Sequence, residues 1–208
     1  MPIRVLDPKV ASKIAAGEVV ERPASVVKEL LENAIDAGAT VIYVEMRNGG
    51  LDLIRVVDNG CGIPHAEMEL AFQHHATSKI SSLDDLQSVQ TLGFRGEALY
   101  SIAAVAQVSL FSRTANDAGG SFLEIADGQI TDRGARGAPQ GTTVTVRNIF
   151  YNIPARRKFL KSADVEGGRI TVLVNQLALA YPALHFYLIS NGRQVFQSTG
   201  SGSLYDAL

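Results

Sequence analysis

Cysteine is almost absent from this 208-residue sequence, tryptophan is missing altogether, and no apolar run is long enough to span a bilayer. The single thiol, Cys61, excludes an internal disulfide and is typical of proteins from a reducing compartment. The N-terminal residues lack the apolar core of a secretory signal. We therefore expect a cytoplasmic protein with no membrane partner.

An excess of either charge is also missing. Lysine and arginine number 19 and aspartate and glutamate 21, which gives a formal net charge of −2. A protein held on nucleic acid by its overall charge would be strongly basic, so that class is disfavoured. Any contact with DNA must come from a local patch or from other parts of a longer chain. The composition, with 46% hydrophobic residues, is ordinary, and 208 residues are enough for one large domain or two small ones.

Helical signals come early in the chain. A short helix is expected from Pro8 to about Gly17, and a stronger one begins at Pro23, which suits a first helical turn. Its apolar residues recur at helical spacing until Gly38, a typical C-terminal cap. Further helices are expected from Pro64, after a capping-box pattern at Ser82 and Asp85, over 97–105 and near 165–179.

Strand patterns fill most of the remainder. Residues 40–47 and 51–57 flank Asn48-Gly49-Gly50 and predict a β-hairpin. Helices early and antiparallel-looking strands throughout predict an α+β fold: a two-layer α/β sandwich whose mixed, mostly antiparallel sheet carries helices on one face. The other expected strands are 106–113, 120–126, 142–148 and a pair around Asn191-Gly192.

The helix that begins at Pro23 places three polar residues together. Glu29, Asn33 and Asp36 stand at i, i+4 and i+7, away from most of the apolar residues. Taken alone, such a face is most often simply solvated. A carboxylate can also take a proton from water, and an amide oxygen can ligate Mg²⁺ beside a phosphate chain. Glu29 and Asn33 are therefore candidates for a base and a metal ligand at one site.

Asp58 follows an apolar strand and begins the sequence Asp58-Asn59-Gly60-Cys61-Gly62. One interpretation is an ordinary turn, in which the aspartate bonds its own backbone and glycine supplies a positive φ. The other is a site for a nucleotide base. A carboxylate at a strand end can accept a hydrogen bond from the exocyclic amine of adenine, and the glycines would let a flat ring approach the backbone. The pattern alone leaves both interpretations open.

A second glycine loop contains Gly93 and Gly96 and precedes the helix expected over 97–105. Its amides and the helix N-terminus can point at an anion. Nearby, the adjacent pair His74 and His75 raises the question of a metal site. Adjacent side chains on a helix point in different directions, and no further histidine or cysteine is close in the sequence. We therefore expect no metal at this pair.

Taken together, four motifs resemble those of the GHKL ATPases, which include DNA gyrase B, histidine kinases and MutL. Stretches 15–23 and 150–160 are similar to the MutL mismatch-repair family, in its bacterial form, and not to the other branches. The resemblance covers nearly the whole chain and implies the GHKL (Bergerat) type of α/β sandwich. The four motifs are Glu29-x-x-x-Asn33, Asp58-x-Gly60-x-Gly62, Gly93-Phe94-Arg95-Gly96-Glu97-Ala98-Leu99 and Gly141-Thr142-Thr143-Val144-Thr145-Val146.

The resemblance implies a site for ATP and Mg²⁺. Glu29 would be the general base for the attacking water, and Asn33 would ligate the ion. Asp58 would recognise the adenine amine, supported by Thr143, and Gly62 would let the base approach closely. The lid over the phosphates would contain Thr77, Gly93, Phe94, Arg95, Gly96, Glu97, Ala98 and Leu99.

The resemblance also implies a role in mismatch repair, with ATP as a conformational switch. The implied partners are a MutS-like mismatch-recognition protein, a downstream endonuclease and helicase, and DNA contacted by the full-length homodimer, which would associate with the nucleoid during repair. A second hypothesis is a nucleotide-responsive adaptor whose hydrolysis is incidental. A kinase is disfavoured because no phosphoacceptor-histidine segment is recognisable. A topoisomerase would not explain the stretch 150–160.

Residues 1–200 are expected to form the ATPase domain, with 201–208 as the start of a linker or of the next domain. In the family, that next domain supplies a lysine that contacts phosphate, and a C-terminal domain dimerises. The 208-residue chain is therefore expected to be a weak ATPase and mostly monomeric without nucleotide.

Two residues depart from the family pattern, and one run that matches it has no assigned chemistry. Tyr100 stands where a small residue is usual and could perturb packing behind the lid, and Ile153 replaces a common threonine. The run Arg156-Arg157-Lys158 belongs to the MutL signature. A structural or solvated role is expected for it, and contact with DNA is the alternative.

Overall fold

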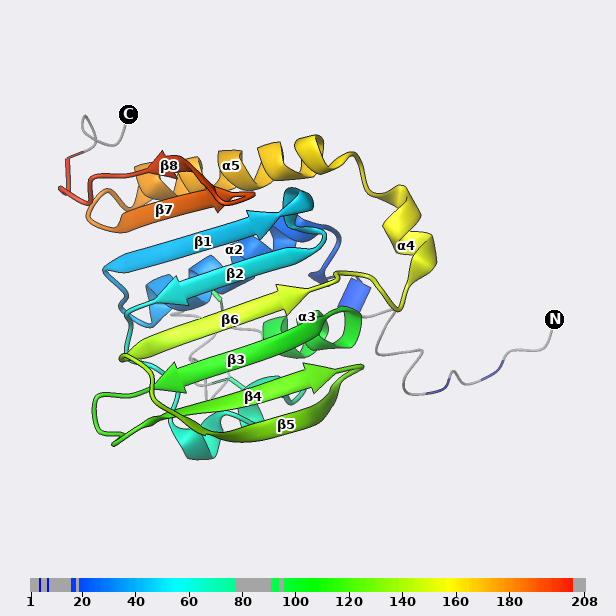
Figure 1. Cartoon of the computed structure of the whole chain (residues 1–208), viewed down its shortest axis with the longest axis horizontal. Coiled ribbons are helices and arrows are strands. Elements are labelled where there is room, and N and C mark those ends of the chain that lie inside the picture. The colour runs from blue at the N-terminus through cyan, green and yellow to red at the C-terminus, as the bar shows by residue number, and fades with distance from the viewer. Residues whose placement is uncertain are drawn as a thin grey trace.

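One eight-stranded sheet dominates the computed structural model, which describes residues 4, 7, 16–17, 19–77, 91–93 and 96–203. The strand order is β5-β4-β3-β6-β2-β1-β7-β8 (Figure 1). Every neighbouring pair is antiparallel except β1 and β7, which run parallel. The strands are β1 Val41–Arg47, β2 Leu53–Asp58, β3 Gln107–Arg113, β4 Gly120–Ala126, β5 Gln129–Arg136, β6 Gly141–Arg147, β7 His185–Ser190 and β8 Arg193–Gln197.

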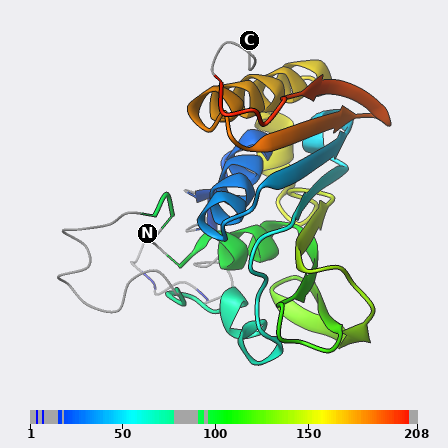
Figure 2. The same ribbon diagram turned by 90° about the vertical axis from the view of Figure 1, so that its left-hand side faces the viewer.

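Helices cover one face of this sheet. Figure 2 shows α2, α3 and α5 on the same side of the strands, which makes two layers. The predicted fold class, an α+β sandwich with a mixed, mostly antiparallel sheet, is confirmed. The helices are α2 Pro23–Asp36, α3 Ala98–Val105, α4 Pro154–Phe159 and α5 Ala163–Ala180.

The core lies between the sheet and its helices. Along β2, Ile54, Val56 and Asp58 are buried and Arg55 is exposed, because successive side chains of a strand point to opposite faces. Burying the apolar members of this layer supplies the main driving force for folding. Helix α2 contributes Pro23, Val26, Val27, Leu30, Leu31 and Ala34 to the same layer.

Several expected elements are confirmed. The hairpin of β1 and β2 is joined by a short 3-10 turn at Asn48–Gly50. Helix α2 ends as expected before Gly38, which has a φ of +71°. The last two strands meet at Asn191 and Gly192, whose φ values of +50° and +78° suit a two-residue hairpin turn.

Other expectations are wrong or lie outside the described residues. No long helix starts at Pro64, where the chain forms only 3-10 turns at His65–Glu67 and Leu70–Phe72. Strand β5 was not predicted because it is an edge strand exposed along most of its length, so it lacks an apolar alternation. Short helix α4 was also missed. The pattern at 82–85 and most of 8–17 fall outside the described residues.

Among the described residues, no helix is both long and apolar enough to cross a membrane.

Candidate functional site

Helix α2 carries the first group of candidate residues. Pro23 opens the helix, and the buried apolar residues hold one side of it against the sheet. Glu29, Asn33 and Asp36 remain partly exposed on the other side, as their spacing predicts. The Glu29 side chain is 28% exposed, and its carboxylate lies 4.0 Å from the ammonium of Lys28. Lys28 pairs more closely with Glu32, at 2.7 Å.

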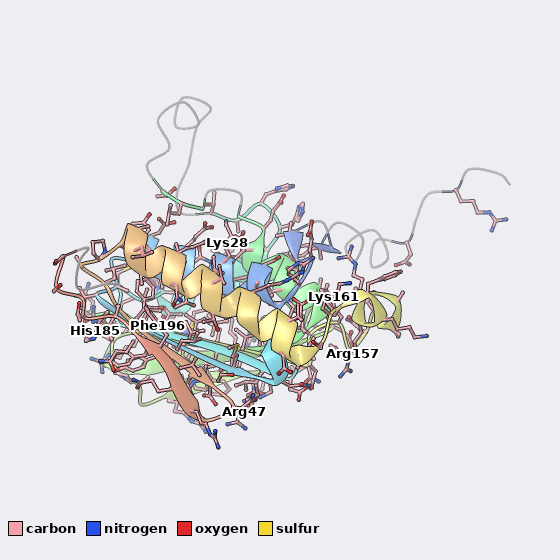
Figure 3. The ribbon with its side chains drawn as sticks, turned by 90° about the horizontal axis from the view of Figure 1, so that it is seen from above. Lys28, Arg47, Arg157, Lys161, His185 and Phe196 are labelled. Atoms are coloured by element: carbon pink, nitrogen blue, oxygen red, sulfur yellow. The ribbon has the colours of Figure 1, made fainter. Side chains whose placement is uncertain are left out.

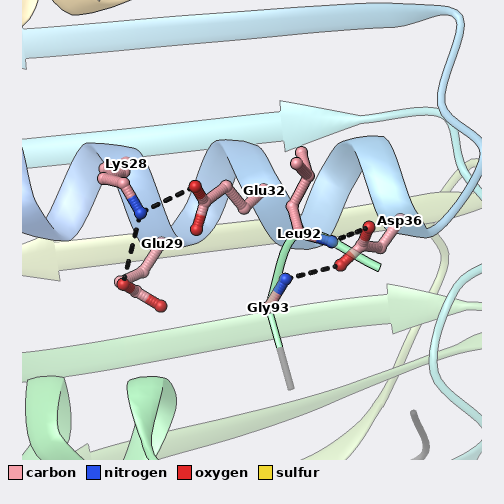
Figure 4. A network of polar contacts seen from close by, with 6 residues as sticks. All are labelled: Lys28, Glu29, Glu32, Asp36, Leu92 and Gly93. Atoms are coloured by element: carbon pink, nitrogen blue, oxygen red, sulfur yellow. Dashed lines mark hydrogen bonds and ion pairs between the residues drawn. The ribbon is translucent and has the colours of Figure 1, made fainter. Parts of the chain in front are cut away.

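Asp36 connects this helix to the second glycine loop (Figure 4). Its Oδ1 accepts a hydrogen bond from the N–H of Leu92 at 3.0 Å, and its Oδ2 accepts one from the N–H of Gly93 at 3.3 Å. The loop thereby starts beside the helix that presents Glu29 and Asn33. The sequence placed Asp36 on the polar face without giving it a role.

Asp58 lies at the end of β2 and is 9% exposed. Its Oδ1 accepts hydrogen bonds from the N–H of Gly60 at 2.8 Å and the N–H of Thr142 at 3.3 Å. Burial raises the pKa of this carboxyl, and the two backbone hydrogen bonds oppose that rise. The bond to Gly60 is the turn contact of the first interpretation. It occupies one oxygen and is compatible with a base site.

The sheet register corrects the choice of threonine. Asp58 pairs with Thr142, whereas Thr143 pairs with Val57. Paired residues of antiparallel strands share a face, and neighbours along a strand alternate, so Thr143 lies on the opposite face from Asp58. The structure therefore brings Thr142 to the carboxylate and does not bring Thr143 there. Alternation along β6 puts Thr142 and buried Val144 on one face, but the register with β2 decides which residue meets Asp58.

Glycines beside Asp58 are required by the protein's own backbone. Gly62 has a φ of +77°, and a Cβ there would lie 2.2 Å from the carbonyl oxygen of Arg113. Gly141 has a φ of +115°, and its Cβ would lie 2.0 Å from the carbonyl oxygen of Asp58. The family resemblance implies that Gly62 lets the adenine base approach the backbone. The structure shows a second reason for glycine here: the carbonyl of Arg113 leaves no room for a side chain.

Further hydrogen bonds fix this loop relative to its neighbours. The N–H of Cys61 donates to the carbonyl of Ala37, one residue after the end of α2, at 2.9 Å. The hydroxyl of Ser112 accepts the N–H of Ile63 at 2.7 Å and donates to the carbonyl of Gly141 at 3.1 Å. The Asp58 loop is thus tied to α2 on one side and to β3 and β6 on the other.

The described lid candidates also lie together. Gly96 has a φ of +63°, and a Cβ there would lie 2.6 Å from the carbonyl oxygen of Ala76, the residue before Thr77. Glu97 occupies the N-cap position of α3, which then begins with Ala98 and Leu99. The segments around Thr77 and Gly96–Leu99 are therefore neighbours. Phe94 and Arg95 lie outside the described residues.

The premise that excluded a metal at the histidine pair is wrong. His74 and His75 lie in a turn after the second 3-10 segment, and not on a helix. Both imidazoles approach the carboxylate of Glu97, at 3.7 Å from His74 and 3.3 Å from His75. Tyr100, which departs from the family pattern, packs its ring edge-on against His74 at 4.9 Å between centroids.

The arrangement provides an acid and an amide on α2, with two glycine loops attached near the C-terminal end of this helix. Asn33 offers the oxygen donor that Mg²⁺ prefers, with the Glu29 carboxylate one turn away, so the donor set fits this ion. Asp58 offers a partly desolvated acceptor for an amine. The N–H groups of Leu92 and Gly93 already donate to Asp36 and so fix the start of the glycine loop.

Comparison with known proteins bears on this site. The sequence profile described as "Histidine kinase-, DNA gyrase B-, and HSP90-like ATPase" matches residues 21–135. The solved structure described as "Aquifex aeolicus MutL ATPase domain complexed with ADP" is 38% identical with a TM-score of 0.72, and the match covers 91% of this chain and 68% of that one. The chain belongs to the MutL family of GHKL ATPases.

Curated MutL sequences extend the likeness over the whole chain. The "DNA mismatch repair protein MutL" of Desulforudis audaxviator is 54% identical over 99% of this chain, and that of Pelotomaculum thermopropionicum is 53% identical over 99%. The chain spans 36% and 34% of those two proteins, about a third of their length. A solved "N terminal domain of a DNA repair protein" is 30% identical with a TM-score of 0.81, covering 98% of this chain and 61% of that one.

Part of the MutL signature at 150–160 has a structural role. Arg156 donates from Nη1 to the carbonyl of Gly17 at 2.5 Å and to that of Val20 at 3.2 Å. Its guanidinium also lies 6.0 Å from the ring centroid of buried Phe150. Arg157, the next residue of the same run, is exposed to solvent on α4 (Figure 3). The structural interpretation thus holds for Arg156.

Proposed function

We propose that residues 1–200 form an ATPase domain that binds ATP with Mg²⁺, hydrolyses it slowly and acts as a conformational switch in DNA mismatch repair. The observation that carries this proposal is the pair of hydrogen bonds from Leu92 and Gly93 to Asp36. They hold a glycine loop against the helix face that presents Glu29 and Asn33. The bound ADP named for a related MutL ATPase domain supports the choice of nucleotide.

Hydrolysis requires a base next to the terminal phosphate. Glu29 is partly exposed, so a water molecule can reach its carboxylate and lose a proton to it. Asn33, one turn further along α2, would ligate Mg²⁺. When bound, Mg²⁺ would neutralise charge on the phosphate oxygens. Its ligation to the same helix would fix the phosphates relative to Glu29.

Adenine would be recognised at the end of β2. The Asp58 carboxylate would accept the exocyclic amine, and the N–H of Thr142 already orients that carboxylate. Gly62 keeps the loop free of side-chain atoms on the side of Arg113. Thr77 and the stretch Gly93–Leu99 would close over the phosphates as a lid.

The switch would act between proteins of the repair pathway. The proposed partners are a MutS-like mismatch-recognition protein and a downstream endonuclease and helicase, with DNA bound by a full-length homodimer in the cytoplasm. The MutL relatives, named as mismatch-repair proteins, support this role. ATP can drive such a switch only if it binds the closed form more tightly than the open one.

Calorimetry with a non-hydrolysable ATP analogue and Mg²⁺ tests the nucleotide site directly. We expect saturable binding by this chain and its loss in Asp58→Ala. Absence of binding by this chain and by a chain extended through the following domain would reject the site. The switch is tested separately by comparing partner binding to the full-length protein with ATP, ADP and the analogue. Equal partner binding in all three would contradict it.

A further inference from the structure

His74, His75 and Glu97 bring three potential metal ligands together beside the glycine loop. One ligand atom from each side chain lies within 4.8 Å of the other two. We propose that these residues bind a divalent transition-metal ion of the Zn²⁺ class. This site is separate in its chemistry from the Mg²⁺ site proposed at Asn33, and it does not depend on nucleotide binding.

The distances suit a tetrahedral ion. Glu97 Oε1 lies 3.7 Å from His74 Nε2 and 3.3 Å from His75 Nδ1. With metal–ligand bonds of about 2.0–2.2 Å, the ligand atoms around a tetrahedral ion are separated by roughly 3.3–3.6 Å. The ligand atoms of the two histidines lie within 4.8 Å of each other, so rotation of the imidazoles would bring all three ligands around one ion.

The local backbone explains why adjacent histidines converge. His75 has a φ of +62°, in the left-handed region that side chains rarely adopt. This turns the chain so that the two imidazoles meet, with ring centroids 3.7 Å apart and an interplanar angle of 64°. Tyr100 packs edge-on against His74 at 4.9 Å and supports that ring.

Glu97 is held in place from two directions. It is the N-cap residue of α3, and its carbonyl accepts the N–H of Ser101 at 2.8 Å. The preceding residue, Gly96, packs so tightly on the backbone of Ala76 that a Cβ would lie 2.6 Å from its carbonyl oxygen. The turn with the histidines and the start of α3 therefore lie side by side before any ion binds.

The ligand types select among metals. Two imidazoles and one carboxylate suit Zn²⁺, Co²⁺ or Ni²⁺, whereas Mg²⁺ prefers oxygen ligands only. The side chains of His74, His75 and Glu97 are 44%, 71% and 26% exposed, so an ion can enter and keep water in its remaining positions. Three protein ligands leave a position for water, which distinguishes this site from a closed structural one with four protein ligands.

Titration with Co²⁺, followed by visible absorption and by calorimetry, tests the site without nucleotide. We expect one equivalent to bind, Zn²⁺ to displace it and excess Mg²⁺ to leave it in place. His74→Ala, His75→Ala and Glu97→Gln should each weaken binding by more than the roughly 10–100-fold that losing an outer-shell partner costs. His65→Ala is the matched control, because His65 instead contacts Ser121 Oγ at 2.9 Å. Cys61→Ser controls for the only thiol.

The unmutated chain provides a second measurement in case a variant fails to fold. Paramagnetic Co²⁺ should broaden the imidazole resonances of His74 and His75 and spare those of His65 and His185. No Co²⁺ binding, or binding lost only in His65→Ala or Cys61→Ser, would overturn the proposal. Nucleotide binding by the unmutated chain is measured in a separate titration with the ATP analogue, so failure of either site can be told from failure of the other.

Discussion

The Asp36 carboxylate accepts the backbone N–H of Gly93 at 3.3 Å, which joins the end of α2 to the beginning of a glycine loop. The same carboxylate accepts the N–H of Leu92 at 3.0 Å, so each of its two oxygens binds one of two adjacent backbone N–H groups. Asp36 is three residues from Asn33 and seven from Glu29 on one helix face. The relative position of the proposed base, the proposed metal ligand and the loop is therefore set by a single helix.

Replacing Asp36 should loosen this loop without unfolding the sheet. In Asp36→Ala, two charge-assisted hydrogen bonds are lost, each worth about 1.5–3 kcal/mol. We expect faster hydrogen exchange at Leu92 and Gly93 and weaker binding of the ATP analogue. Asp52→Asn, at an exposed position, is the control. Unchanged exchange at Leu92 and Gly93 would show that Asp36 does not hold the loop.

Replacing Glu29 should separate binding from turnover. Glu29→Gln keeps the shape of the side chain and removes its basicity, so the ATPase rate should fall by about 100-fold or more while analogue affinity is kept. The rate is best measured in the full-length protein. Glu32→Gln, which changes the closer partner of Lys28 and leaves the proposed base, should retain most of the activity. Normal turnover in Glu29→Gln would contradict the assignment.

Replacing Asp58 should change both recognition and pH dependence. In Asp58→Asn, an amide donor can face the adenine amine, and analogue affinity should fall by about tenfold or more. Burial raises the pKa of Asp58 in the folded state above its ordinary 3.8, so the folded state holds a proton that the unfolded state has released. The free energy of unfolding should therefore fall as pH rises from 3.8 through the folded pKa.

Asp58→Asn should lack that fall, because an amide does not titrate. Urea unfolding of both proteins across this pH range checks the sign. If the difference in unfolding free energy between them stayed constant with pH, the buried carboxyl would not be the cause.

Alanine substitutions at two glycines with similar φ angles can distinguish backbone strain from a steric clash. Gly62 and Gly128 have φ values of +77° and +70°, but a Cβ on Gly128 meets nothing within 4 Å. Gly128→Ala should cost only the strain of the left-handed backbone, about 1 kcal/mol. Gly62→Ala adds a clash with the carbonyl of Arg113 and should lower the free energy of unfolding by several times as much. Thermal melting of the two variants gives the comparison.

Substitutions of Arg156 and Arg157 should differ in their effect on stability, because Arg156 is hydrogen-bonded to the backbone and Arg157 is exposed. Arg156→Ala leaves the carbonyls of Gly17 and Val20 without their donor, and we expect a loss of about 1–3 kcal/mol in unfolding free energy. Arg157→Ala, at an exposed position of the same helix, should change it by less than about 0.5 kcal/mol. Equal effects in chemical denaturation would contradict the distinction.

The fold was largely predictable because its central elements carry regular apolar spacing. Helix α2, the hairpin of β1 and β2, and the turn at Asn191 and Gly192 were all expected. Strand β5 was missed because an exposed edge strand has no buried face to leave a pattern in the sequence. The helix expected at Pro64 failed because a proline start signal does not reveal how far the helix continues.

The candidate site was predictable in its residue types and less so in its geometry. The motifs identified Glu29, Asn33 and Asp58 as candidates, because each motif lies within one helix or at the end of one strand. Thr142 was missed in favour of Thr143, because the choice depends on the register between β2 and β6. The contact of His74 and His75 with Glu97 depends on a turn with a positive φ that the sequence does not signal.

The parallel pairing of β1 with β7 has a consequence for folding. Val41 lies beside His185 in this pair, so two strands from opposite ends of the chain must meet before the sheet is complete. Contacts between such distant residues slow folding, because a long loop must close before any of them forms. During synthesis, β1 can pair with β2 at once but waits for β7 until most of the domain has been made. Until then, β1 presents an open edge that another chain could occupy.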